Sequence, residues 1–143
     1  MSDFRPLAQN VFASPQICAA DIATAKDMGI TLVINNRPDD EVPGQPSGAE
    51  IEAAARANGL DYVAIPVTQA GFSAPQIDAM AKALQQANGG VLAYCRSGTR
   101  STNLWALACA SQGTDPAELV STARDAGYDL TGIRPMLDML AGG

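Results

Sequence analysis

The sequence predicts an α/β fold, with a small central and mostly parallel sheet of four to five strands flanked by helices. Strand-like and helix-like segments alternate along the chain, which is the pattern of a parallel sheet with helical crossovers. The segments 30–36 and 90–94 are continuous apolar runs, as expected of strands buried on both faces. At 143 residues the chain suits one domain with a sizeable core, so we expect a single domain over 1–143.

The first half of the chain supplies the first strands and helices of this sheet. In chain order we expect a short edge strand at 11–13, a helix at 19–28, a strand at 30–36, a loop at 37–46, a helix at 48–58 and a strand at 60–67. Gly29 and Gly59 follow the two helices, where glycine commonly ends a helix. Ser47 and Glu50 have the spacing of a capping box, which marks the start of the second helix.

The second half continues the alternation and then becomes helical. We expect a helix at 74–88, a strand at 90–94, a helix at 101–112, and two closing helices near 115–126 and 132–141. Ser73 and Gln76 repeat the capping-box spacing. Thr114 should cap the helix near 115–126, and Gly127 should end it.

Charge and cysteine content narrow the class of protein. Nine basic and fifteen acidic residues give a formal net charge of -6 and a pI near 4.4. A nucleic acid or an anionic membrane requires a basic face, so we expect neither as a partner. Three cysteines do not make a disulfide framework, no signal peptide is visible, and no apolar run approaches the roughly 20 residues that cross a bilayer. We therefore expect a cytoplasmic protein with free thiols.

The sequence contains no histidine. This excludes Ser-His-Asp and Cys-His catalysis, zinc sites that need imidazole, and phosphohistidine chemistry. We expect neither a metal nor a cofactor. A cysteine nucleophile in this chain must be activated by other groups.

Three loops follow the predicted strands and should meet at one edge of the sheet: 35–46, 67–73 and 95–101. The carboxyl ends of parallel strands form the ligand-binding edge of such folds, because helix N-termini converge there. We therefore expect the functional site among these loops.

The segment CRSGTRS, residues 95–101, has the composition of an anion-binding loop that carries a reactive thiol. A free thiol loses its proton only near pH ~8.5, and a helix N-terminus lowers that value. Cys95 directly precedes such a terminus, so we expect it to be the nucleophile, with Arg100 holding an oxyanion. Ser101 would either hydrogen-bond the thiolate or cap the helix. The further residues expected to bind the anion are Arg96, Ser97, Gly98, Thr99 and Ser101.

Asn36, Arg37 and the other two cysteines indicate a functional role less clearly than the residues of 95–101. Asn36 and Arg37 are candidates for orienting the substrate anion, the alternative being a turn with a surface arginine. Cys109 lies in an apolar stripe and is expected in the core. Cys18 is expected to be structural, with a resolving thiol as the alternative.

Two resemblances bear on the function. AYCRSGTRS resembles the active-site loop of rhodanese-like sulfurtransferases. Over roughly residues 10 to 110, the segments GITLVINNRPDDEVPGQPSGAEIEAAARANGLDYVAIPV, GFSAPQIDAMAKAL and VLAYCRSGTRSTNLWALA together resemble the bacterial beta-lactamase-hydrolase-like family with a phosphatase-like fold. The resemblance implies a fold similar to that of dual-specificity phosphatases, a rhodanese-like fold being the alternative. It also implies an association with a persulfide-processing metallo-hydrolase.

The chain departs from cysteine phosphatases in two ways. Those enzymes have five residues between the cysteine and the arginine, whereas four separate Cys95 from Arg100. They also take a general-acid aspartate from the preceding loop, but PVTQAGFS (66–73) contains no carboxylate, and Asp61 and Asp78 lie in the flanking strand and helix. A shorter loop suits the terminal sulfur of a persulfide, whose transfer needs no acid because the leaving groups are stable anions.

These features favour a sulfurtransferase that moves sulfane sulfur through a Cys95 persulfide. The donor would be a small anion such as thiosulfate or a persulfide, and the acceptor a thiol. One alternative is a phosphatase of the dual-specificity type that hydrolyses phosphate esters through a phosphocysteine. Another is a non-catalytic module that senses anions or redox state.

Overall fold

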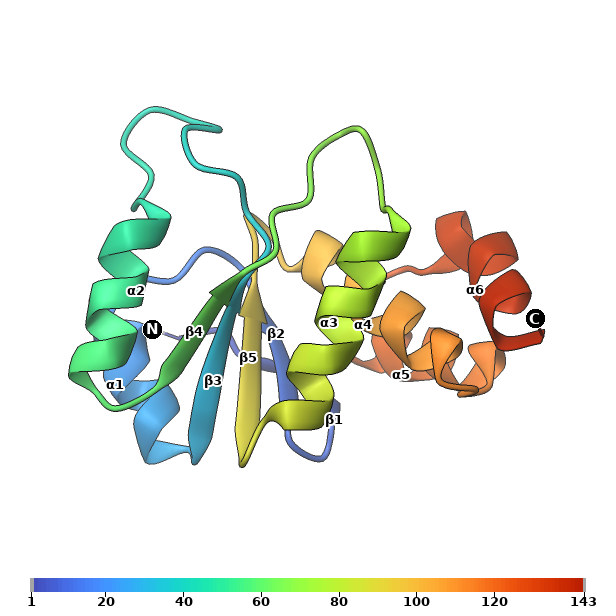
Figure 1. Cartoon of the computed structure of the whole chain (residues 1–143), viewed down its shortest axis with the longest axis horizontal. Coiled ribbons are helices and arrows are strands. Elements are labelled where there is room, and N and C mark those ends of the chain that lie inside the picture. The colour runs from blue at the N-terminus through green and yellow to red at the C-terminus, as the bar shows by residue number, and fades with distance from the viewer. Residues whose placement is uncertain (1, 143) are drawn as a thin grey trace.

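The computed structural model describes residues 2–142 and contains one five-stranded sheet (Figure 1). The strand order is β1-β2-β5-β3-β4. The strands are β1 (Arg5–Ala8), β2 (Val11–Ser14), β3 (Ile30–Asn35), β4 (Asp61–Ala64) and β5 (Gly90–Tyr94). β1 pairs antiparallel with β2, and the other neighbours are parallel. The predicted fold class is confirmed.

Helices cover both faces of the sheet. The helices are α1 (Ala19–Asp27), α2 (Gly48–Ala57), α3 (Ala74–Gln86), α4 (Thr99–Ser111), α5 (Pro116–Asp125) and α6 (Arg134–Gly142). Figure 1 shows α1 and α2 on one face and α3 and α4 on the other, with α5 and α6 packed beyond α4. None of the helices within residues 2–142 has the length and apolar character to cross a membrane.

The sheet separates two apolar cores, and β5 contributes to both. Leu92 and Tyr94 belong to the cluster beneath α1 and α2, whereas Val91 and Ala93 belong to the larger cluster beneath α3 and α4. Successive side chains of a strand point to opposite faces, so a central strand must be apolar throughout. Every residue of β5 is buried accordingly. The strand therefore holds its carboxyl end, where Cys95 follows, in a fixed position.

The strand predictions differ from the structure at both edges of the sheet. The segment expected as an edge strand, 11–13, lies inside the sheet as β2, and the unpredicted β1 forms the edge. β1 contains Pro6, which cannot donate to a ladder and is tolerated at a sheet edge. The strand expected to reach residue 67 ends at Ala64, shortly before Pro66.

Most helices end one or two residues before the predicted boundary, and further differences occur at the starts of α4, α5 and the last helix. α4 begins at Thr99 rather than at residue 101, because Gly98 adopts a positive φ and serves as its N-cap. Asp115, not Thr114, caps α5, since its side chain accepts a hydrogen bond from the Ala117 amide. The last predicted helix divides into a 3₁₀ turn, Thr131–Ile133, and α6.

Candidate active site

The loop after β5 delivers Cys95 to the N-terminus of α4. Gly98 has φ 93°, a left-handed conformation that glycine adopts freely, and it turns the chain sharply into the helix. The Gly98 amide donates a hydrogen bond to Cys95 Sγ at 3.1 Å. The sulfur therefore lies at the N-terminus of α4, a position at which backbone amides commonly hold anions.

The thiol itself is buried. Cys95 is 0% exposed, whereas Arg96, Ser97 and Thr99 in the same loop are exposed. The Ser97 hydroxyl donates to the Thr99 hydroxyl, and the Thr99 amide donates back to Ser97 Oγ. These two side chains therefore bond to each other and not to the sulfur. Cys95 is thus shielded from solvent by its neighbours, and the Gly98 amide is the group that donates to its sulfur within residues 2–142.

Arg100 lies at the centre of the three loops. Its Nη1 and Nη2 bind the two carboxylate oxygens of Glu41 at 2.6 and 2.8 Å. Nη1 also donates to the carbonyl of Val67 at 2.8 Å. These hydrogen bonds with Glu41, and the nearby Cys95 sulfur, raise the pKa of Arg100. The loops after β3, β4 and β5 are thus joined through one guanidinium, at the sheet edge that the sequence predicts.

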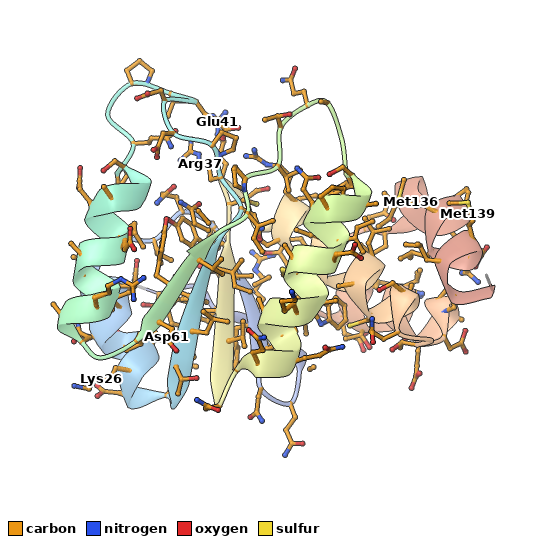
Figure 2. All side chains as sticks on the ribbon, in the orientation of Figure 1. Lys26, Arg37, Glu41, Asp61, Met136 and Met139 are labelled. Carbon is orange, nitrogen blue, oxygen red and sulfur yellow. The ribbon has the colours of Figure 1, made fainter. Side chains whose placement is uncertain are left out.

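Glu41 also binds a second arginine. Arg37 donates from Nε to Glu41 Oε1 at 2.8 Å and from Nη1 to Gln16 Oε1 at 2.9 Å. Hydrogen bonding to Arg100, with a further contribution from Arg37, lowers the pKa of the Glu41 carboxyl to about 2. Figure 2 shows Arg37 and Glu41 together at the carboxyl end of the sheet, and Asp61 at the opposite end. No pattern in the sequence indicates that this one residue neutralises both arginines.

Asn36 and Ser101 connect two of these loops beneath the surface. The Ser101 hydroxyl donates to Asn36 Oδ1 at 2.8 Å, and Asn36 Nδ2 donates to the Ile65 carbonyl at 2.9 Å. Both side chains are fully buried. Ser101 therefore neither caps α4 nor bonds the sulfur in this structure. The amide oxygen of Asn36 accepts from Ser101 and its Nδ2 donates within the protein, and its role in orienting a substrate stays a prediction.

A cavity of about 590 Å³ opens beside the loop. Arg96, Arg100 and Glu41 line it together with the loop after β4, residues 67–72. Arg37 does not line this cavity: it is 5% exposed and turned into the protein. The cavity therefore brings together Arg96 and Arg100 from the predicted anion-binding loop, and Cys95 is not among its lining residues.

Tyr128, between α5 and the 3₁₀ turn, packs against the loop that follows Cys95. Its hydroxyl donates to the Ser97 carbonyl at 3.1 Å, and its ring packs against Gly98. The Arg5 guanidinium stacks on this ring at 5.2 Å from the centroid. A segment far from the loop in sequence thus fixes its backbone, and the sequence contains no signal for this contact.

The other two cysteines lie away from the cavity. Cys18 is exposed and caps α1, where its backbone amide donates to Asp21. Cys109 is half-buried against the larger core, and burial raises the pKa of its thiol to about 11. Over residues 2–142, no three metal-ligating side chains are gathered closely enough to hold a metal ion.

The sequence relationships agree with this architecture. Residues 3–112 match the family described as beta-lactamase hydrolase-like protein, phosphatase-like domain. The chain belongs to this family. This phosphatase-like domain is 35% identical over 112 residues to the beta-lactamase hydrolase-like protein of Agrobacterium fabrum, and 38% identical over 105 residues to that of Xylella fastidiosa. The matches cover 78% and 71% of the chain, but only 26% and 24% of those longer proteins.

Solved structures place the domain among cysteine phosphatase folds. A Neisseria meningitidis protein designated a phosphatase is 32% identical and superposes with a TM-score of 0.85. The superposition covers 96% of this chain and 98% of that one. The active form of Tk-PTP superposes with a TM-score of 0.69 at 18% identity, over 98% of this chain and 97% of that one. Pseudomonas aeruginosa TpbA gives 0.68 at 18% identity, over 99% and 85%. The phosphatase-like fold of the resemblance is thereby confirmed.

Proposed function

We propose that this phosphatase-like domain is a cysteine-dependent phosphatase in which Cys95 is the nucleophile and Arg100 binds the transferred oxyanion. The observation that carries the proposal is the Gly98 amide bonded to Cys95 Sγ at the N-terminus of α4, with Arg100 in the first turn of the same helix. The similarity to a Neisseria protein designated a phosphatase supports this reaction over the sulfurtransferase predicted from the sequence. TpbA bound to phosphotyrosine and the SIW14 phosphatase bound to citrate support a small anionic substrate.

The reaction would proceed in two steps. The Cys95 thiolate attacks phosphorus, an S–P bond forms, and the P–O bond to the leaving group breaks with its electron pair on that oxygen. Water then attacks the phosphocysteine, the S–P pair returns to sulfur, and a proton of the water passes to solvent. Arg100 and the loop amides would stabilise the charge that accumulates on the phosphoryl oxygens.

Turnover of 4-nitrophenyl phosphate tests the proposal. Cys95→Ser should abolish activity, and Arg100→Ala should lower kcat by about 10²–10³-fold, the usual effect of losing an oxyanion donor. Cys18→Ser, which removes an exposed thiol away from the cavity, is the matched control and should retain activity. Equal activity of Cys95→Ser and wild type would overturn the proposal. Tight phosphate binding without turnover would favour a non-catalytic anion-sensing module.

A second candidate is sulfur transfer, which the four-residue spacing between Cys95 and Arg100 favours. The thiolate would attack the outer sulfur of thiosulfate, and the S–S pair would leave with sulfite. An acceptor thiolate would then remove the sulfur from the Cys95 persulfide. Mass spectrometry after incubation with thiosulfate should show one added sulfur atom on wild type and none on Cys95→Ser; an unmodified wild type would exclude thiosulfate as the donor.

A further inference from the structure

The cavity beside Cys95 contains a single carboxylate among its lining residues within 2–142, that of Glu41. A phosphatase that cleaves alkyl esters needs a protonated acid at this place, because an alkoxide is too basic to leave unaided. Whether Glu41 can supply that proton determines which substrates the site can use.

The surroundings of Glu41 keep it ionised. One oxygen accepts from Arg100 and the other from both Arg100 and Arg37, and its side chain is only 26% exposed. A proton on either oxygen would have to displace one of these charge-assisted hydrogen bonds. Hydrogen bonding to two guanidinium groups therefore holds the carboxylate as an acceptor and prevents it from acting as a proton donor.

The same contacts leave two N–H donors of Arg100 available for an anion. A guanidinium has five N–H donors. Glu41 and the Val67 carbonyl use both N–H groups of Nη1 and one of Nη2. The Cys95 sulfur also interacts with this guanidinium. Nε–H and the second Nη2–H lie along the remaining edge, and neither donates to an oxygen of residues 2–142. This edge is a complete two-donor fork for an oxyanion, so Glu41 orients Arg100 without occupying the part that binds substrate.

We propose that Glu41 is a positioning residue for Arg100, and that the site cleaves only phosphoryl donors whose leaving group departs as a stable anion. This class contains aryl phosphates, acyl phosphates and phosphoanhydrides, and it excludes simple alkyl phosphates. The proposal rests on the proposed phosphatase function. In the first step the P–O pair stays on the leaving oxygen, and no proton is transferred to it.

The leaving-group dependence of the wild-type enzyme tests the substrate class. Across substituted phenyl phosphates, kcat/KM should fall steeply as the pKa of the phenol rises towards its ordinary value of about 10. Acetyl phosphate should be hydrolysed, and an alkyl phosphate such as glycerol 3-phosphate should be slower than 4-nitrophenyl phosphate by at least about 10²–10⁴-fold, the usual contribution of a general acid. A flat dependence, or comparable turnover of the alkyl ester, would overturn the inference while leaving the phosphatase proposal intact. Absence of turnover with every donor would overturn both.

Glu41→Gln separates positioning from proton donation. Loss of a charge-assisted hydrogen bond to Arg100 should lower kcat/KM about 10-fold or more, by the same factor for every donor, and should weaken inhibition by inorganic phosphate equally. Glu118→Gln, at an exposed position on α5, is the matched control and should change neither quantity. Thermal melting of both variants verifies that they are folded. A selective loss with poor leaving groups would identify Glu41 as the acid and contradict the proposal, as would unchanged phosphate inhibition.

Discussion

Gly98 fixes the shape of the loop that holds the thiol. Its φ of 93° lies in the left-handed region, where residues with a Cβ are strained. A Cβ at this position would also collide with the hydroxyl of Tyr128, which donates to the neighbouring Ser97 carbonyl. The conformation and the available space therefore both require glycine.

Gly98→Ala should destabilise the protein more than a glycine substitution that causes strain alone. Gly113→Ala is the matched control, since Gly113 has φ 98° and a Cβ added there would meet nothing within 4 Å. Both changes should cost about 1–2 kcal/mol through the left-handed conformation. Gly98→Ala should cost more, because Tyr128 must move away from Ser97. Urea unfolding of the two variants measures the difference, and equal losses would show that the tyrosine contact is not tight.

Local patterns predict some individual residues well and others poorly. Cys95 and Arg100 stand out because a short polar loop joins an apolar strand to a helix, and their catalytic roles remain predictions. Glu41 does not stand out, because it lies 59 residues from Arg100 in a loop whose composition indicates only a turn. Asn36 is a binding candidate by its position, but a buried hydrogen bond to Ser101 already occupies its amide oxygen. Contacts between distant loops are not encoded in local spacing.

At the scale of elements, α4 contributes both to the candidate site and to the larger core. Its N-terminus holds the loop with Cys95, and its buried side chains, including Leu104, Trp105 and Leu107, form the centre of the larger core. The helix packs against α3, α5 and α6. The packing that stabilises the fold therefore also fixes the geometry of the loop.

Leu107→Ala should lower the free energy of unfolding by about 2–5 kcal/mol, because Leu107 is fully buried and its removal leaves a cavity. Met139→Ala on α6 is the control. Met139 is 66% exposed, so its truncation should change stability by only about 0.5 kcal/mol. Figure 2 shows Met139 on the outer side of α6. Equal effects in chemical denaturation would mean that α4 is not the centre of the core.

The sequence predicts the elements themselves best where burial is uniform. The strand 90–94 has the boundaries that its residues predict, because five apolar-leaning residues between a glycine and a cysteine match a central strand. β1 escapes prediction because four residues with a proline carry almost no periodicity, and pairing with β2 determines their conformation. Helix starts differ from the prediction where an unpredicted cap, Gly98 or Asp115, ends the preceding loop.

At the scale of the whole molecule, the sheet order determines where the structure should open first. β5 lies between β2 and β3 and is buried throughout, whereas β4 is a short edge strand with exposed ends. Hydrogen exchange should therefore be slowest for the amides of β5 and faster for those of β4 and β1. Exchange of β4 as slow as that of β5 would contradict this order, and mass spectrometry of the exchanged peptides resolves the two strands.

The contact between Tyr128 and the loop 95–98 determines how long a fragment of this chain must be to keep the loop in place. Sequence similarity to the family covers residues 3–112, and Tyr128 lies outside that range. A fragment cut at the similarity boundary would keep Cys95 and Arg100 but lose the hydroxyl that anchors Ser97 and the ring on which Arg5 stacks. The folded unit therefore extends past residue 112, through Tyr128 to Leu130 and Leu137 in the larger core. The segment from residue 113 onward belongs in any expression fragment of this domain.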